Sequence, residues 1–173
     1  MLRELLPGAT VMAALVNPTN SNAAKQSDDM RTAARALGLQ LYVLHASSDS
    51  DFDAAFVALS QVRASAVVIG ADTFFVSRSA QLGALTARHK VPAIYQFREF
   101  AAAGGLLSYG SSIIESYRQV GIYTGRILKG ERPADLPVQQ STKVELIINM
   151  KTAKTLGLTF PLTLLGRADD VIE

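Results

Sequence analysis

The chain has 173 residues, and with 49% hydrophobic and 18% charged residues it can bury a core and does not have the composition of a disordered chain. A formal net charge of +2 without any basic run gives no sign of a nucleic-acid partner. The chain has no cysteine and two well-separated histidines, which excludes a disulfide and a cysteine nucleophile and argues against a metal site.

Four apolar runs of strand length recur along the first hundred residues. They are residues 9–16, 39–44, 66–71 and 91–95. The step between them, about 27 residues, holds one strand, one helix and two short loops. The pattern therefore predicts an α/β fold with a doubly wound parallel sheet and right-handed crossovers.

The segments between these strands carry apolar residues at helical spacing, preceded by residues that cap helices. Three helices are expected: one over about 22–37, one that begins near residue 50, and one that ends near residue 88. The predicted caps are Asn20 or Ser21, Ser50 with Asp53, and Ser77. Gly38 is expected to end the first of these helices in a left-handed conformation.

The regular alternation ends after the fourth strand, at the small-residue crossing Ala101–Gly105. A strand over 106–109 and a helix that begins with a capping box, Ser112 with Glu115, are predicted next. The segments after that helix are an extended linker over 131–140, a strand over 142–149, a short helix over 151–156 and a packed tail over 159–173. Such a change of pattern indicates a change of domain, and a cleft between domains is a common place for a ligand.

Ligands of parallel α/β sheets bind beyond the carboxyl ends of the strands, so the loops there are candidate sites. The loop after the first strand offers Asn17, Thr19 and Asn20 together with the free N–H groups of a helix start, which favour a carboxylate. The same residues are those of an ordinary turn and helix cap, and both interpretations remain open.

The loop after the third strand places Asp72 beside Phe74 and Phe75. A carboxylate next to aromatic rings suits a ligand with an ammonium group and an apolar side chain. Alternatively, Asp72 caps a turn and one phenylalanine belongs to the core. The sequence has no phosphate-binding loop, nucleophile motif or pair of carboxylates at catalytic spacing, so recognition without catalysis and without a cofactor is expected.

Four stretches resemble, in the same order, the second half of the tryptophan/tyrosine-type substrate-binding proteins of ABC transporters. They are LVNPTN, VVIGADTFF, VPAIYQFREFAAAGGLLSYG and GRILKGERPADLPVQQSTKVELIINMKTAKTLGL. The resemblance extends over nearly the whole chain and is most specific from Val91 to Leu158.

This resemblance implies a periplasmic binding protein of the type I fold, in which two α/β lobes joined by three hinge strands clamp the ligand. We therefore expect residues 1–100 and 142–173 to form the second lobe, and residues 101–141 to form the hinge crossing and a returning segment of the first lobe. A signal peptide and the rest of the first lobe would precede Leu2.

The resemblance also implies a non-enzymatic, solute-binding component of an ABC importer, periplasmic or otherwise extracytoplasmic. Its partners would be a small-molecule ligand, an amino acid or a similar compound, and a membrane permease. With Phe74 from the loop described above, the ligand-binding positions expected are Asn17, Thr19, Asn20, Asp72, Tyr95, Ser108 and Tyr109.

Two other functions share the predicted architecture. The chain could be the effector-sensing domain of a transcriptional repressor, in which case a DNA-binding motif would precede residue 1. It could also be a doubly wound enzyme, although the missing phosphate-binding loop argues against a nucleotide-dependent one.

Without the rest of the first lobe, we expect the strand over 106–109 to have no sheet partners and the apolar side of the following helix to be exposed. That side carries Ile113, Tyr117, Val120, Ile127 and Leu128. Exposed apolar patches and unpaired strand edges favour association. We therefore expect a homodimer through about residues 105–130, with folding of this segment back onto its own lobe as the alternative.

Overall fold

Within the residues that the computed structural model describes, 1–139 and 144–173, seven strands form one sheet in the order β2-β1-β3-β4-β5-β6-β7. The strands are β1 (Val11–Val16), β2 (Gln40–His45), β3 (Val67–Ile69), β4 (Ala93–Tyr95), β5 (Leu107–Ser111), β6 (Val144–Asn149) and β7 (Asp170–Ile172). Strands β5 and β6 are antiparallel, and every other pair of neighbours is parallel. The parallel sheet predicted from the first four strands is confirmed.

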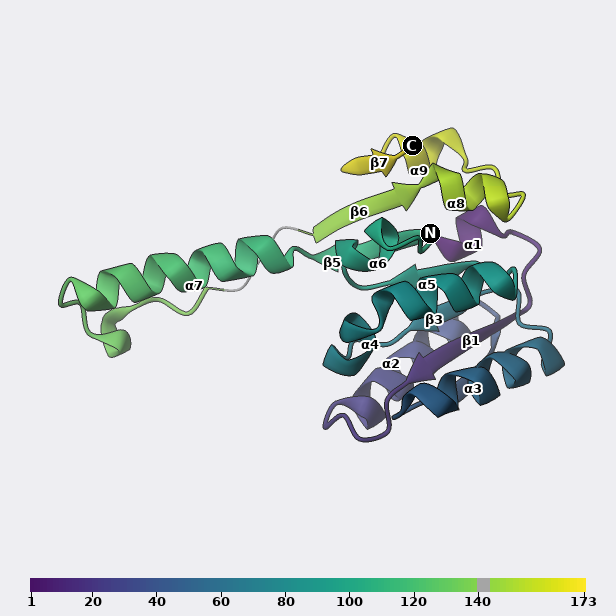
Figure 1. Ribbon diagram of the computed structural model, residues 1–173, viewed down its shortest axis with the longest axis horizontal. Helices are drawn as coiled ribbons and strands as arrows, with labels where there is room; N and C mark the ends of the chain where they lie inside the picture. Colours follow the sequence, from purple (N-terminus) through teal and green to yellow (C-terminus); the bar gives the residue numbers. More distant parts are fainter. Residues whose placement is uncertain (140–143) are drawn as a thin grey trace.

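Helices cover both faces of this sheet (Figure 1). The helices of the described residues are α1 (Leu2–Leu5), α2 (Ala23–Ala36), α3 (Asp49–Gln61), α4 (Thr73–Ser77), α5 (Ser79–Arg88), α6 (Arg98–Ala102), α7 (Ile113–Leu128), the 3-10 turn η1 (Pro133–Asp135), α8 (Met150–Thr155) and α9 (Leu162–Leu165), of which α7 and η1 lie away from the sheet. Residues 140–143 lie outside the described residues. They hold one end of the predicted linker, the start of the predicted strand over 142–149 and the predicted domain boundary.

Two apolar cores lie on opposite faces of the sheet because neighbouring strand residues point in opposite directions. Val67 packs into the core that α3, α4, α5 and α6 cover, whereas Val68 faces the core to which α1, α2, α8 and α9 contribute. The interior strand β1, which lies between β2 and β3, is buried on both sides, with Ala13 and Ala14 fully inaccessible. This is why the sequence of β1 is continuously apolar and not alternating.

The structure corrects three predicted helix starts. Helix α3 begins after Ser48, which forms a capping box with Asp51, so the predicted pair Ser50 and Asp53 is wrong. Ser77 caps no helix, because the chain already turns helical after Asp72. At α2 the N-cap is Asn22 and it makes no side-chain cap bond, while the predicted cap Asn20 accepts the N–H of Asn22 instead.

The segment after β4 also differs from the prediction. The crossing includes a helix, α6, and the strand after it has sheet partners on both sides, β4 and β6. The expectation that this strand is left unpaired is therefore wrong, because β6 returns beside it. The predicted tail contains the helix α9 and also a strand, β7, whose Asp170 pairs with Arg98 of α6.

Residues 112–139 form an arm that extends away from the rest of the molecule (Figure 1). Helix α7 starts at the predicted cap Ser112, whose hydroxyl accepts the N–H of Glu115 at 3.3 Å. The extended segment after η1 runs back along the helix, where the Tyr123 hydroxyl donates to the carbonyl of Pro137 at 2.6 Å. No residue of α7 is buried. The predicted exposure of its apolar side is confirmed.

Candidate functional site

The loop after β1 and the loop after β3 meet at the carboxyl edge of the sheet. Asn17 Nδ2 donates to Asp72 Oδ1 at 3.1 Å, and Asn20 Nδ2 donates to Asp72 Oδ2 at 2.8 Å. Thr19 is tied to the same cluster, since its hydroxyl donates to Asn17 Oδ1 at 2.8 Å. The two loops that the sequence marks as candidate sites therefore lie on one rim, and we call Asn17, Thr19, Asn20 and Asp72 the rim cluster.

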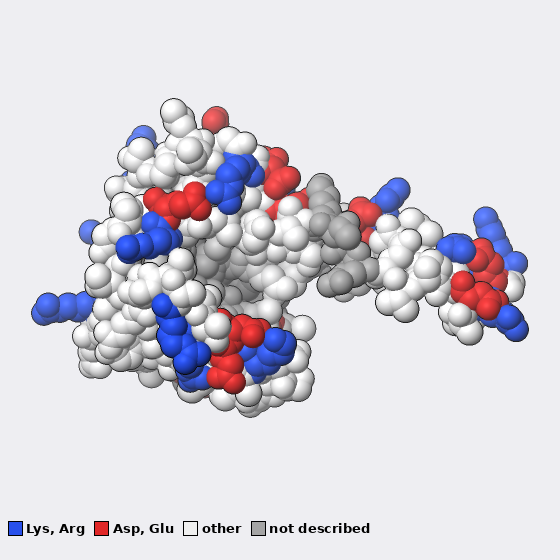
Figure 2. Space-filling view, turned by 180° about the vertical axis from the view of Figure 1, so that it is seen from behind, with Lys and Arg blue, Asp and Glu red and all other residues white. Residues whose placement is uncertain are grey.

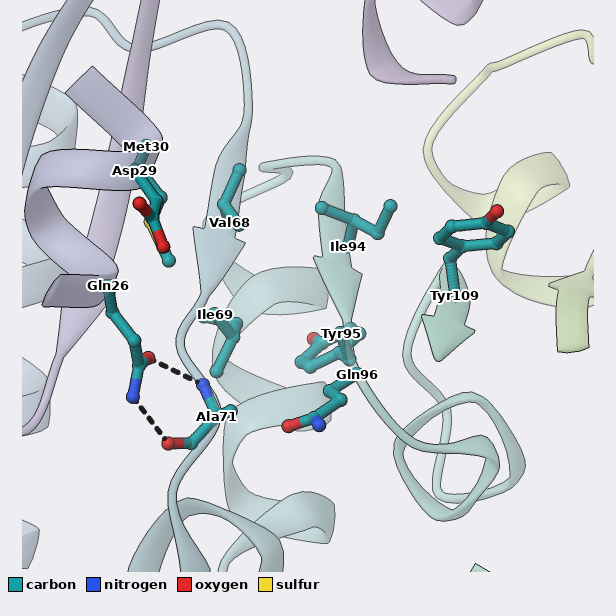
Figure 3. A pocket seen from close by; sticks show the side chains of 10 residues that line it. All are labelled: Gln26, Asp29, Met30, Val68, Ile69, Ala71, Ile94, Tyr95, Gln96 and Tyr109. Atoms are coloured by element: carbon teal, nitrogen blue, oxygen red, sulfur yellow. Dashed lines mark hydrogen bonds between the residues drawn. The ribbon is translucent and has the colours of Figure 1, made fainter. Parts of the chain in front are cut away.

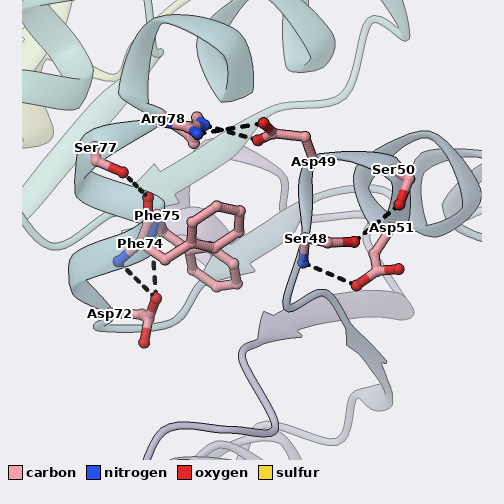
Figure 4. Close-up of polar contacts among 9 residues, drawn as sticks. All are labelled: Ser48, Asp49, Ser50, Asp51, Asp72, Phe74, Phe75, Ser77 and Arg78. Atoms are coloured by element: carbon pink, nitrogen blue, oxygen red, sulfur yellow. Dashed lines mark hydrogen bonds and ion pairs between the residues drawn. The ribbon is translucent and has the colours of Figure 1, made fainter.

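Asp72 also caps helix α4. Its Oδ1 atom accepts the N–H groups of Phe74 at 2.9 Å and Phe75 at 3.2 Å (Figure 4). Partial burial acts to raise the pKa of Asp72, but the hydrogen bonds from Asn20, Asn17 and these two N–H groups outweigh it and hold the pKa below its ordinary value. Asp72 is therefore ionised at neutral pH, and it serves as cap and rim carboxylate together.

The two phenylalanines after Asp72 have different environments. Phe75 is fully buried, as one of the two predicted interpretations required, whereas Phe74 is half-buried. The Phe74 ring stacks on Phe52 with centroids 5.4 Å apart, lies 5.9 Å from the Phe75 ring, and has the guanidinium of Arg78 5.5 Å from its centre. Arg78 is itself held by Asp49 at the start of α3 at 2.7 Å (Figure 4).

The other predicted site residues do not join the rim cluster. Tyr95 is buried and stacks on Phe100, and its hydroxyl lies 3.0 Å from that of Thr86. Burial raises the pKa of the Tyr95 hydroxyl. Ser108 is 1% exposed, and its hydroxyl has no hydrogen-bond partner among the described residues. Tyr109 is the next residue of β5, so its side chain points to the other face of the sheet from that of Ser108, and it is half exposed.

A trough of about 310 Å³ opens on the α2 face of the sheet, next to the rim cluster (Figure 3). Val68 of β3 and Ile94 of β4 form its floor, and α2 and β5 form its two sides. We call it the trough, and the residues that line it are Gln26, Asp29, Met30, Val68, Ile69, Ala71, Ile94, Tyr95, Gln96 and Tyr109.

Two glutamines of the trough were missed by sequence reasoning. Gln26 holds the loop after β3 to α2, because its side chain accepts the N–H of Ala71 and donates to the carbonyl of Ala71, both at 2.9 Å. The buried side-chain oxygen of Gln96 has no partner among the described residues. Gln96 directly follows β4, so the rule that ligands bind beyond strand ends could have selected it as well as Tyr95. Side chains alternate between the two faces along a strand, and this turns the Tyr95 ring toward the core. No sequence signal marks Gln26.

Other classes of site find no support in the described parts of the chain. These residues contain no group of three or more histidine, aspartate or glutamate side chains placed to hold a metal ion. None of the helices within residues 1–139 and 144–173 is long and apolar enough to cross a bilayer.

Comparison with known proteins identifies one family. The family model of ABC transporter substrate binding proteins matches residues 1–172. Among proteins with curated descriptions, none matches this chain in sequence.

Solved structures with similar folds come from three bacteria. A conserved domain protein from Vibrio cholerae superposes with a TM-score of 0.86 at 24% identity, over 98% of this chain and 57% of that one. An ABC domain in complex with L-Trp from Streptococcus pneumoniae gives 0.86 at 23% identity, over 99% and 59%. A ligand-free, open substrate binding protein with adhesive properties from Clostridium difficile gives 0.72 at 20% identity, over 99% and 57%.

These likenesses show the fold. The chain has the α/β architecture of the periplasmic-binding-protein type that its sequence predicts, and it spans a little under three fifths of the length of each of these three structures.

Proposed function

We propose a solute-binding function for this chain, which belongs to the family of ABC transporter substrate binding proteins. The observation that carries the proposal is the rim cluster, in which two asparagines and a helix start hold the ionised carboxylate of Asp72 at the carboxyl edge of the sheet. A carboxylate fixed in this way recognises a cationic group. The hydrogen bonds that lower the pKa of the Asp72 carboxylate make it a weak base, and the Thr19 hydroxyl donates to Asn17, so the proposed role of the cluster is recognition and not catalysis.

The ligand we propose is an amino acid or a similar small molecule with an ammonium group. Asp72 Oδ1 already accepts three hydrogen bonds, whereas Oδ2 accepts one, from Asn20, and keeps lone pairs for an ammonium group. The half-buried Phe74 ring lies two residues away and offers an apolar contact. The likeness to an L-Trp complex supports a ligand of this class.

We further propose that the chain acts in an ABC importer, outside the cytoplasm, and delivers its ligand to a membrane permease. In this proposal residues 1–100 and 142–173 form one lobe, and residues 101–141 form a hinge crossing and a segment that belongs to a second lobe. The arm supports this division, because its apolar side packs against nothing within the described residues. A second copy of the chain, paired through residues 105–130, is the further partner we propose.

Titration calorimetry with a panel of amino acids, including tryptophan, tests the ligand class. Asp72→Asn removes the charge but keeps an acceptor for the helix start, and it should weaken binding by about 1–3 kcal/mol, roughly 5–150-fold. Asp51→Asn is the matched control, because Asp51 also accepts N–H groups at a helix start but lies in the first turn of α3, outside the rim cluster.

Indole-3-propionate, which has the ring and carboxylate of tryptophan without its ammonium group, should bind more weakly than tryptophan. If Asp72→Asn leaves the affinity for every bound amino acid unchanged, or if Asp51→Asn weakens it equally, Asp72 does not recognise the ligand.

A further inference from the structure

One peptide at the carboxyl edge of the sheet is held by a side chain where a neighbouring strand would otherwise hold it. Strand β1 bonds the residue that follows β3, because the Leu15 carbonyl accepts the N–H of Gly70 at 2.8 Å. At the next residue, Ala71, the N–H donates to Gln26 Oε1 and the carbonyl accepts from Gln26 Nε2, both at 2.9 Å (Figure 3). Paired residues of an antiparallel ladder exchange hydrogen bonds in this way. The Gln26 amide therefore continues the sheet by one residue.

Gly70 makes room for this contact. A Cβ atom added at Gly70 would lie 2.7 Å from Gln26 Oε1 and 3.0 Å from the Leu15 carbonyl oxygen. The Leu15 carbonyl belongs to a buried strand, so the Gln26 side chain is the group that would have to move. The φ angle of Gly70 is not positive, so the need for glycine here is spatial and not conformational. Glycine beside a strand often marks such a close approach.

The Ala71 peptide determines where the rim carboxylate starts, because Asp72 is the next residue. Its carbonyl also accepts Asn20 Nδ2 at 3.3 Å, and the same amide donates to Asp72 Oδ2 at 2.8 Å. Within the described residues Gln26 bonds Ala71 and not Asp72. A shift of the Ala71 peptide would therefore move both Asp72 and its link to Asn20.

We propose that Gln26 is a positioning residue of the ligand site. It fixes the Ala71 peptide, in the space that Gly70 leaves, so that the Asp72 carboxylate is held toward the ammonium group of the ligand. This inference rests on the solute-binding function proposed above, and it adds a residue that touches neither the ligand nor the carboxylate.

The contact acts through geometry and not through charge. Gln26 is neutral, and the charged residues near it on α2 pair among themselves, Lys25 with Asp29 at 2.8 Å and Asp28 with Arg31 at 3.0 Å. Charges of both signs lie beside one another on the back of the molecule (Figure 2). Gln26→Ala changes no charge, and alanine is favourable in a helix. A loss of affinity in this variant therefore reports a displaced carboxylate.

Calorimetry with two ligands separates positioning from stability. The probes are tryptophan, or the amino acid that binds most tightly, and its analogue without the ammonium group, which for tryptophan is indole-3-propionate. Gln26→Ala should weaken binding of the amino acid roughly fivefold, the effect of one lost hydrogen bond, and should leave the analogue almost unaffected. Gln40→Ala is the matched control, because Gln40 lies at the amino end of β2 and donates to the Tyr42 hydroxyl at 2.7 Å. Equal weakening of both probes by Gln26→Ala would overturn the positioning role.

Hydrogen exchange of the ligand-free chain tests the positioning directly. The N–H of Phe74 donates to Asp72 Oδ1 at 2.9 Å, so its exchange reports where the carboxylate lies. Gln26→Ala should speed this exchange roughly fivefold. The N–H of Leu82 in α5, which donates to the Arg78 carbonyl at 2.9 Å, should exchange as in the wild-type chain. Equal acceleration at Phe74 and Leu82 would show that Gln26 only supports the fold.

Gly70→Ala tests whether the glycine serves this contact. In the wild-type background it should displace the Gln26 amide and also speed exchange at Phe74. In the Gln26→Ala chain the 2.7 Å contact no longer exists, so Gly70→Ala should have a clearly smaller effect there. Additive effects of the two substitutions would show that these residues act independently, which contradicts the proposal.

The outcomes separate this inference from the solute-binding proposal. If Asp72→Asn weakens binding and Gln26→Ala does not, the rim binds the ligand but Gln26 does not position it. If the wild-type chain binds no amino acid, the solute-binding proposal fails and with it the ligand role of Gln26, whereas exchange at Phe74 still decides whether Gln26 holds Asp72. Circular dichroism of each variant shows whether it is folded.

Discussion

Asp72 offers the sharpest test of how the rim is built. Asp72→Ala removes the acceptor of four hydrogen bonds, two from the side chains of Asn17 and Asn20 and two from N–H groups at the start of α4. The loops after β1 and β3 would then keep one direct link, the hydrogen bond from Asn20 Nδ2 to the Ala71 carbonyl at 3.3 Å. We expect both a less stable chain and a looser rim.

The size of the effect follows from these contacts. Loss of a capping carboxylate costs about 1 kcal/mol, within a range of 0.5–2. Asn17 is buried, so its amide left without an acceptor costs about another 1 kcal/mol, while the half-buried Asn20 can turn to water at a smaller cost. Together these give a loss of about 2–3 kcal/mol in the free energy of unfolding.

The same contacts predict a pH dependence. Hydrogen bonds to the carboxylate lower the folded-state pKa of Asp72 below its ordinary value of 3.8. A group with a depressed folded pKa contributes stability above its unfolded pKa and loses that contribution as the pH falls through the folded pKa. The gap in stability between the wild-type chain and Asp72→Ala should therefore be largest near neutral pH and should narrow below about pH 4.

Urea unfolding followed by circular dichroism, at several pH values, measures this gap. The control is Asp53→Ala, because Asp53 is an exposed helix residue whose one ion pair, with Arg88, is a surface contact. A loss below 0.5 kcal/mol for Asp72→Ala at pH 7, or a gap that widens as the pH falls, would refute this account of the rim.

Two further substitutions test the packing beside the trough and below it. Gly110→Ala would place a Cβ atom 2.2 Å from the carbonyl oxygen of Gln96, so we expect a loss of about 1–3 kcal/mol in urea unfolding, whereas Gly8→Ala, with nothing within 4 Å, should cost far less. Tyr95→Phe removes a buried hydroxyl contact with Thr86 and should cost about 1 kcal/mol; a gain in stability would show that this contact contributes nothing. Because burial raises the Tyr95 pKa, the phenolate absorbance of the native chain in mild alkali should be the same with and without Tyr95.

The fold was predictable because its signals are local and repeated. Apolar runs at a regular step determine a parallel sheet, and Gly38 indeed has the positive φ, 66°, that ends a helix. Where the predictions fail, several residues could serve equally well. Ser48 and Ser50 can each cap α3, and the choice falls on Ser48 because Asp51 accepts the N–H groups of both Ser47 and Ser48.

The site was predictable in part. The rule that ligand loops follow strand ends places Asn17 and Asp72 on one rim, and the structure confirms this placement. The same rule cannot tell which face of a strand its last side chain takes. Tyr95 packs its ring against Phe100 in the core and only borders the trough, whereas Gln96 has a side-chain oxygen without a partner there among the described residues. The pairing of β5 with β6 depends on residues more than thirty positions apart, which no local pattern encodes.

Capping and recognition need not be alternatives at Asp72, although the sequence presents them as such. The amide groups of Asn17 and Asn20 both point their N–H donors at the carboxylate, and the Thr19 hydroxyl donates to Asn17. Both N–H groups of the Asn20 amide, one N–H of the Asn17 amide and the Thr19 hydroxyl are therefore already engaged, which leaves one N–H of Asn17 for a ligand. The rim carries the negative charge of Asp72, so under the proposed function an amino acid would approach it with its ammonium end, and most contacts to its carboxylate would have to come from groups outside the rim cluster. A neutral side chain at position 72 could have joined the two loops equally well. The Asp72 carboxylate adds a net negative charge at the edge of the sheet, and its Oδ2 atom can still accept a hydrogen bond, so it can bind a cation.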